Sequence, residues 1–156
     1  MKSLTLFRHA KTERDSESGR DFDRRLIERG QTDSKRMGEE MRSLGLEFDL
    51  VLSSPAARAA ETAELAGLTP RFDERIYDAA PGELLAIVQS ADSGTGRLAM
   101  VGHNPGFERL ASRLIGQMVD MPTGSLIEIE MPVDRWEDVD DGNGRVVRFV
   151  RPKELR

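Results

Sequence analysis

The chain has 156 residues, with 23 lysines and arginines against 28 aspartates and glutamates, and a formal net charge of −5 at pH 7. This length predicts a single domain over residues 1–156, and an acidic chain without a basic patch argues against a nucleic-acid partner. The absence of cysteine excludes disulfides, thiolate metal sites and a cysteine nucleophile.

The first patterned segment is residues 4–12, Leu-Thr-Leu-Phe-Arg-His-Ala-Lys-Thr. A short, largely apolar run ends in Arg8 and His9, the pattern of a buried strand that delivers polar side chains to the edge of a sheet. A guanidinium can hold two phosphate oxygens, and an imidazole can act as a nucleophile or a base. The pair alone is more often an ordinary surface pair, so its meaning depends on the rest of the chain.

Residues 13–25 are polar and without periodicity, which predicts an exposed loop that could border a site. The sequence Asp21-Phe22-Asp23 superficially resembles the motif of an aspartate-nucleophile phosphatase. No apolar strand precedes it, however, so a solvated loop is the better interpretation.

A strand between two helices is expected next. Residues 32–44 have the spacing of an amphipathic helix, and residues 48–52 that of a second buried strand. Ser53-Ser54-Pro55 then combines an N-cap candidate with a proline at the first position of a helix over residues 55–66. Arg58 lies in the first turn of this helix, where the helix dipole disfavours a cation unless an anion lies in front of it.

The rest of the chain continues this alternation and then changes to strands. The expected elements are a short strand at 69–76, a helix at 81–89, a buried strand at 97–102, a helix after Asn104 from Pro105 to about Gln117, and an antiparallel pair of edge strands at 125–131 and 145–150. The acidic turn at 136–144 lacks the pattern and flanking helices of a calcium-binding loop, so no metal site is predicted. No apolar run reaches the length of a signal peptide or a membrane span, so we expect a cytoplasmic protein.

Alternating strands and helices predict an α/β fold whose mainly parallel sheet is covered on both faces and binds ligands beyond the carboxyl ends of its strands. Arg8 and His9 end the first strand, Arg58 follows the second, and His103 ends a later one. We therefore expect both histidines of the protein and two arginines at one edge, where they would form a phosphate site.

Three motifs resemble the signatures of the histidine phosphatase superfamily, which has the phosphoglycerate-mutase-like fold. They are Arg8-His9-Ala10-Lys11-Thr12, Ser53-Ser54-Pro55-Ala56-Ala57-Arg58-Ala59 with Thr62, and Val101-Gly102-His103-Asn104-Pro105-Gly106. The chain length and the last motif are similar to the short SixA-type phosphohistidine phosphatase branch, and the likeness includes Thr123-Gly124. The resemblance implies a three-layer α/β/α fold with a mixed, mainly parallel sheet.

The resemblance also implies a metal-independent phosphatase without a cofactor, which hydrolyses phosphohistidine on a protein or other phosphomonoesters. His9 would attack phosphorus and become transiently phosphorylated, while Arg8, Arg58 and His103 hold the phosphate oxygens. Water would then hydrolyse the phosphoenzyme. This agrees with the physics of phosphoryl transfer, in which fixed cations stabilise charge on three oxygens.

Some positions depart from the family pattern or match it loosely. Ala10 replaces the usual glycine, and Arg25 stands where relatives often have proline, which leaves the shape of that loop open. Glu74 resembles the general acid of the mutase branch and is the tentative acid here. Asp78 and Glu83 lie close to it, and a surface carboxylate is the plainer interpretation of each.

Two alternative functions stay open. A non-catalytic phosphoprotein-binding module could use the same cage of arginines and histidines, and a phosphosugar mutase or phosphatase would use the same nucleophile. The sequence has no long insertion to form the lid that a mutase would need. The expected partner is a phosphorylated protein or a small phosphorylated substrate, with no nucleic acid and no membrane. Few residues lie between the third strand and His103 beyond one helix, which predicts an open pocket suited to a phosphohistidine side chain.

Overall fold

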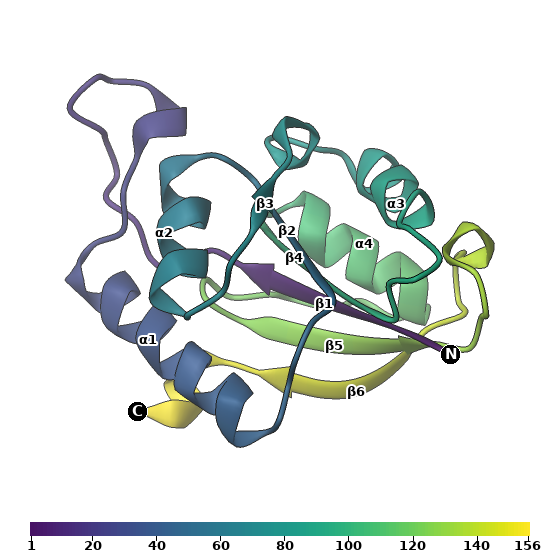
Figure 1. The fold of residues 1–156 in the computed structure, drawn as a ribbon. Helices are drawn as coiled ribbons and strands as arrows, with labels where there is room; N and C mark the ends of the chain where they lie inside the picture. The colour runs from purple at the N-terminus through teal and green to yellow at the C-terminus, as the bar shows by residue number, and fades with distance from the viewer.

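The computed structural model describes residues 1–156 and contains one six-stranded sheet with helices on both faces (Figure 1). The order of strands across the sheet is β3-β2-β4-β1-β5-β6. Neighbours from β3 to β1 are parallel, whereas the β1–β5 and β5–β6 pairs are antiparallel. The strands are β1 (Lys2–Arg8), β2 (Leu50–Ser53), β3 (Arg71–Phe72), β4 (Arg97–Gly102), β5 (Leu126–Met131) and β6 (Arg145–Val150). The predicted α/β class with a mixed, mainly parallel sheet is confirmed.

The helices form two outer layers. Helices α1 (Glu28–Ser43) and α2 (Ala57–Leu65) pack on one face, and α3 (Pro81–Gln89) and α4 (Gly106–Ile115) on the other (Figure 1). The sheet has a hydrophobic core on each face. Alternate side chains of β1 enter these two cores, because successive residues of a strand point to opposite faces. Leu4 and Leu6 pack with α3 and α4, whereas Phe7 packs with α1 and α2. None of these helices has both the length and the apolar character to cross a membrane.

Helix α1 begins at Glu28, four residues before the predicted start at Thr32. Its first turns bury Gly30, Asp33 and Ser34, which are small or polar, so no apolar periodicity marks this part of the helix. The buried polar groups are paired: the Ser34 hydroxyl donates to the Gly30 carbonyl at 2.7 Å, and Arg156 donates to Asp33 at 3.0 Å. The helix is therefore stabilised here by hydrogen bonds that the hydrophobic pattern does not reveal.

The predicted third strand at 69–76 is wrong beyond Phe72, because β3 has only two residues and a 3-10 turn, Glu74–Ile76, follows it. The Asp73 carboxylate accepts a hydrogen bond from the Arg75 backbone N–H at 3.0 Å, which caps this turn. The other ranges agree more closely, and α3, β4 and β6 have the predicted limits.

The two helices nearest the strand ends begin later than predicted. Helix α2 starts at Ala57 rather than at Pro55, and Pro105 is the N-cap of α4 rather than its first residue. Asn104 still acts at this turn, because its side-chain oxygen accepts from the Glu108 N–H at 3.2 Å.

We predict that Gly30→Ala destabilises the protein by about 1–3 kcal/mol, the usual cost of overpacking. A Cβ at Gly30 would overlap the carbonyl oxygen of Lys11, so α1 could no longer pack against the segment that follows β1. Gly82→Ala is the matched control in the first turn of α3, where the nearest atom to an added Cβ is 3.9 Å away. That change should be neutral or stabilising by up to ~1 kcal/mol. Urea unfolding measures both, and equal effects would contradict the packing argument.

Candidate active site

The structure brings Arg8, His9, Arg58 and His103 together at the carboxyl ends of the parallel strands. Arg8 of β1 pairs in register with Gly102 of β4. The residues that follow these two strands, His9 and His103, therefore lie side by side. Their ring centroids are 5.3 Å apart. Arg58 lies in the first turn of α2, and with His103 it lines a cavity of about 290 Å³.

The backbone around His9 is fixed from several sides. The His9 N–H donates to the Gly102 carbonyl at 3.0 Å, and the His9 carbonyl accepts from the Gly124 N–H at 2.8 Å. The Ala10 N–H donates to the Thr62 hydroxyl at 3.0 Å. Gly124 has a φ of +77°, which favours glycine. Thr62 and Gly124, both noted in the sequence motifs, thus hold the segment that carries the imidazole.

The orientation of the His9 ring determines its tautomer. Nδ1 lies 2.8 Å from the Ala10 carbonyl oxygen, which can only accept, so Nδ1 carries the proton and Nε2 keeps its lone pair. The pKa of His9 is lowered to about 3, mainly by burial and to a smaller extent by the neighbouring His103, Arg58 and Arg8. The ring is therefore a neutral base at physiological pH.

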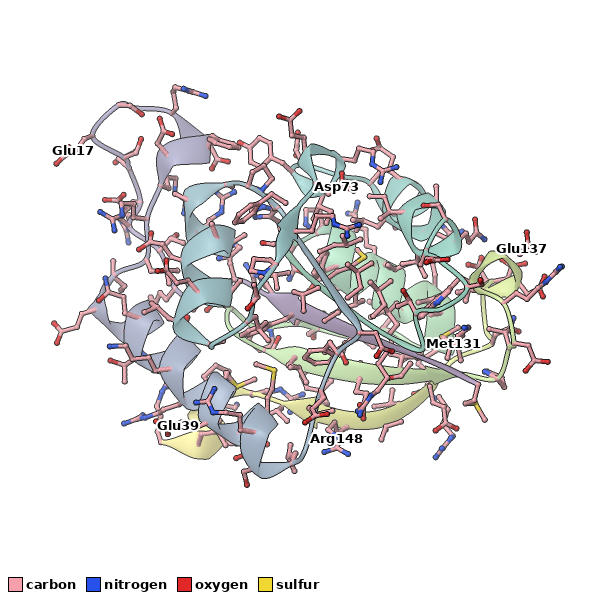
Figure 2. The ribbon with its side chains drawn as sticks, in the orientation of Figure 1. Glu17, Glu39, Asp73, Met131, Glu137 and Arg148 are labelled. Carbon is pink, nitrogen blue, oxygen red and sulfur yellow. The ribbon has the colours of Figure 1, made fainter.

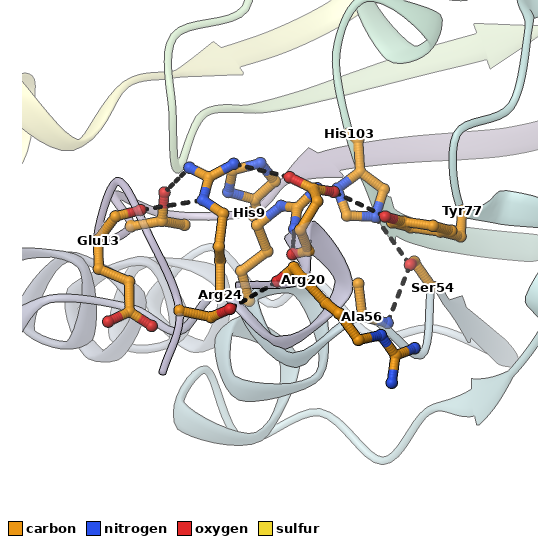
Figure 3. Close-up of polar contacts among 12 residues, drawn as sticks. His9, Glu13, Arg20, Arg24, Ser54, Ala56, Tyr77 and His103 are labelled. Carbon is orange, nitrogen blue, oxygen red and sulfur yellow. Dashed lines mark hydrogen bonds and ion pairs between the residues drawn. The ribbon is translucent and has the colours of Figure 1, made fainter. Parts of the chain in front are cut away.

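His103 is held by Ser54 (Figure 3). Its Nε2 lies 2.7 Å from the Ser54 hydroxyl, which also accepts from the Ala56 N–H at 3.2 Å. We assign the serine proton to the bond with Nε2, so in neutral His103 the ring proton lies on Nδ1. Burial lowers the pKa of His103 to about 4, and Arg58 contributes in the same direction. Sequence analysis assigned Ser54 only a capping role and missed this contact with the site.

Each arginine is anchored through its terminal nitrogens. Arg8 donates from Nη1 to the Met121 carbonyl at 2.8 Å, and Asn104 donates to the same carbonyl at 2.9 Å. Arg58 donates from Nη1 to the Asp21 carbonyl at 2.8 Å and from Nη2 to the Asp21 carboxylate at 3.0 Å. Both guanidinium groups are thus fixed in orientation while the Nε of each stays unpaired.

Four buried side-chain nitrogen or oxygen atoms in the chain have no hydrogen-bond partner, and three of them belong to this cluster. They are Arg8 Nε, Arg58 Nε and His103 Nδ1; the fourth is Thr5 Oγ1 in β1. A buried unpaired donor costs about 1–3 kcal/mol, and more when it is charged. Oxygens of an anion are the partners that such donors prefer, so the chemistry of the cluster suits a phosphoryl group.

Comparison with known proteins places the chain in a family. The family model described as "Histidine phosphatase superfamily (branch 1)" matches residues 4–93. The chain belongs to the histidine phosphatase superfamily. An uncharacterized protein of Mycobacterium tuberculosis is 30% identical over 145 residues, which cover 85% of this chain and 92% of that protein.

Solved structures of SixA proteins share the fold of this histidine phosphatase. The SixA protein of Agrobacterium tumefaciens has a TM-score of 0.83 and 25% identity, over 97% of this chain and 98% of that chain. The protein histidine phosphatase SixA complexed with tungstate has a TM-score of 0.85 and 21% identity, over 99% of each chain. The resemblance to the SixA-type branch is confirmed, and family membership supports phosphatase activity on a phosphorylated substrate.

Asp21 and Tyr77 are site residues that sequence analysis missed. Tyr77 donates to the Asp21 carboxylate at 2.7 Å and Arg24 donates to it at 2.9 Å, in addition to the bond from Arg58. The Tyr77 ring lies edge-on to His103, with 5.6 Å between centroids. These contacts join residues far apart in the chain, and the sequence signal was only that the polar loop over residues 13–25 could border a site.

Glu74, the tentative acid, lies in the exposed 3-10 turn after β3 and is not among the residues that line the cavity. Asp78 does line the cavity and has a φ of +55°, in the left-handed region. The structure thus brings Arg8, His9, Arg58 and His103 together, and the role of Glu74 stays a prediction.

The shape of the loop around Arg25, which the sequence did not determine, is fixed by contacts that a proline at this position would not allow. The Arg25 N–H donates to the Glu13 carboxylate at 2.8 Å, and proline has no N–H. The Arg25 guanidinium pairs with Glu61 of α2 at 3.1 Å. Arg24 donates to the Glu13 carbonyl at 3.0 Å and to the Thr12 hydroxyl, which fixes the base of the loop. Figure 2 shows Glu17 at its outer tip.

Neither histidine lines the hollows of about 660, 550, 390 and 360 Å³ elsewhere on the surface. The largest of these lies between α1 and the segment that leads into β2. No group of three or more histidine, aspartate or glutamate side chains is arranged to hold a metal ion.

We predict that the two imidazoles make the protein less stable in acid. Their pKa values are lowered to about 3 and about 4 in the folded protein, against ~6.5 in an unfolded chain, so the unfolded state binds more protons between these values. The free energy of unfolding should not depend on these imidazoles above about pH 6.5. Below that pH it should fall by up to ~1.4 kcal/mol per pH unit for each imidazole as the pH decreases. Urea unfolding from pH 7 to pH 4 should show a shallower decline in His9→Asn than in wild type, and identical slopes would contradict this account.

Proposed function

We propose that this histidine phosphatase hydrolyses phosphohistidine on a carrier protein, or other phosphomonoesters, through a phosphohistidine intermediate on His9. The observation that carries the proposal is the set of three buried, unpaired nitrogens of Arg8, Arg58 and His103, whose charges and ring lie near enough to His9 to lower its pKa. The complex of a SixA protein with tungstate, a tetrahedral oxyanion, supports an oxyanion site in this fold.

In this mechanism the lone pair on His9 Nε2 attacks phosphorus, and the bond from phosphorus to the leaving group breaks with its electrons on the leaving group. The donors of Arg8, Arg58 and His103 hold the three other phosphoryl oxygens and stabilise the charge that they carry in the transition state. The positive charge that develops on the His9 ring is stabilised by the bond from Nδ1 to the Ala10 carbonyl. Water then attacks phosphorus, the bond to Nε2 breaks and inorganic phosphate is released.

The leaving group favours phosphohistidine over alkyl phosphates. A departing imidazole that already carries a proton on its other nitrogen leaves as a neutral ring. An alkoxide, in contrast, needs a general acid that contributes about 10²–10⁴-fold. The tentative acid Glu74 is exposed and outside the cavity lining. A site with well-held phosphoryl donors and an exposed tentative acid suits a phosphoramidate best.

We predict that His9→Ala abolishes phosphate release and that EDTA has no effect, because the arginines supply the positive charge in this mechanism. Arg58→Ala should remain folded and lose about 10²–10³-fold in kcat, the usual effect of removing a fixed transition-state donor. Release of phosphate from a phosphohistidine peptide and from 4-nitrophenyl phosphate measures both, with circular dichroism to check folding.

Full activity in His9→Ala, or activity that EDTA removes and a divalent ion restores, would refute this mechanism. A wild-type protein that binds the phosphohistidine peptide tightly and never releases phosphate would indicate the binding module instead.

A further inference from the structure

We propose that Asp21 makes this site selective for substrates in which the group bonded to phosphorus is positively charged before that bond breaks. Such substrates are phosphoramidates, for example phosphohistidine with a protonated ring. The inference rests on the proposed function and assigns to the loop after β1 a role that none of the sequence motifs suggested. Its basis is the position of one ionised carboxylate beside a phosphate site.

Asp21 is held in place by three side chains that converge on its carboxylate. Tyr77 donates to Oδ2 at 2.7 Å, Arg58 donates to the same oxygen at 3.0 Å, and Arg24 donates to Oδ1 at 2.9 Å (Figure 3). The Asp21 carbonyl also accepts from Arg58 at 2.8 Å. Because both terminal nitrogens of Arg58 are engaged, the carboxylate and the unpaired Nε of Arg58 are parts of one fixed unit.

Asp21 lies at the mouth of the site rather than at its base. The His9 residue is 6% exposed, whereas the Asp21 side chain is 51% exposed. A row of rings runs outward from His9 through His103 and Tyr77 to Phe22, with successive centroids 5.3, 5.6 and 5.1 Å apart. In an in-line transfer the leaving group lies opposite the nucleophile. The leaving group of a protein substrate therefore points outward, toward Asp21.

The charge on Asp21 is negative throughout the physiological range. The hydrogen bond from Tyr77, followed by those from Arg24 and Arg58, holds the pKa of this carboxyl well below its usual range. An ionised carboxylate cannot donate a proton to an alkoxide, and it repels the anionic phosphoryl group of any substrate. The interaction of the Asp21 carboxylate with a substrate becomes favourable when the group bonded to phosphorus is positively charged, because the two opposite charges attract.

Protonated phosphohistidine meets this requirement. The N–H of its ring can donate to the free face of the Asp21 carboxylate, which raises the share of bound substrate that carries the proton. His9 Nε2 then forms its bond to phosphorus while the bond from phosphorus to the substrate nitrogen breaks. The electron pair of that bond stays on the substrate nitrogen, and the ring, which keeps the proton on its other nitrogen, leaves as neutral imidazole.

Asp21 could instead serve only to position Arg58, and the two roles predict different results. Loss of a purely positioning contact weakens the hold on the phosphoryl group, which every substrate shares, so all substrates would slow in proportion. Loss of a charge that faces the leaving group slows only substrates in which that group is positively charged before its bond to phosphorus breaks.

The test measures kcat/KM for a phosphohistidine peptide and for 4-nitrophenyl phosphate at pH 7 in wild type, Asp21→Asn and Asp21→Glu. Asp23→Asn is the matched control, because Asp23 lies in the same 3-10 turn, contacts Ser18 and Arg20, and lies outside the cavity lining. We expect Asp21→Asn to lower the ratio of the two kcat/KM values about 10-fold, the effect of losing one charge-assisted hydrogen bond. Asp21→Glu should restore part of the ratio, and Asp23→Asn should leave it unchanged.

An unchanged ratio in Asp21→Asn, with both substrates slowed equally or not at all, would overturn this inference and leave the proposed function intact. A ratio that rises in Asp21→Asn would overturn it as well. Wild-type protein that turns over neither substrate would refute the proposed function itself, and the three results are distinguishable in one data set.

Discussion

Two guanidinium groups and two imidazoles lie together below the surface, and the properties of the site follow from how this charge is accommodated. Burial and mutual repulsion lower the pKa values of His9 and His103 to about 3 and about 4, so both imidazoles stay neutral well into the acid range and the two guanidinium groups carry the positive charge of the cluster. The two cations that remain are anchored by backbone carbonyl groups. The same constraint thus keeps His9 unprotonated, as a nucleophile must be, and leaves nearby donors unpaired for an anion.

The fold supplies this arrangement through strand register. Because β1 and β4 are parallel neighbours, the residues that follow them emerge at the same edge of the sheet. The Gly124 N–H then donates to the His9 carbonyl and the Thr62 hydroxyl accepts from the Ala10 N–H, so the segment that carries the ring is fixed before any ligand binds. The loop over residues 13–25 adds the Asp21 carboxylate at the mouth, where it pairs with Arg58 and with Arg24 of the same loop.

Sequence analysis identified the four central residues because a topological rule places strand ends and the following helix starts at one edge, and polar residues at those points are visible in the sequence. It missed Asp21, Tyr77 and Ser54, whose roles arise from side-chain contacts between distant segments that no periodicity encodes. The early start of α1 was missed because buried polar groups replace the apolar pattern there. The third strand was predicted too long, since a capped turn ends it at Phe72.

The central claim is that His9 carries the phosphoryl group during turnover. The most direct measurement is to mix the protein with a ³²P-labelled phosphohistidine peptide, quench within milliseconds in alkali, where phosphohistidine survives, and locate the label by peptide mass spectrometry. The account predicts transient label on the peptide that contains His9, bound at Nε2 and released as phosphate at longer times. Phosphate release without label on His9, or label on His103 instead, would contradict it.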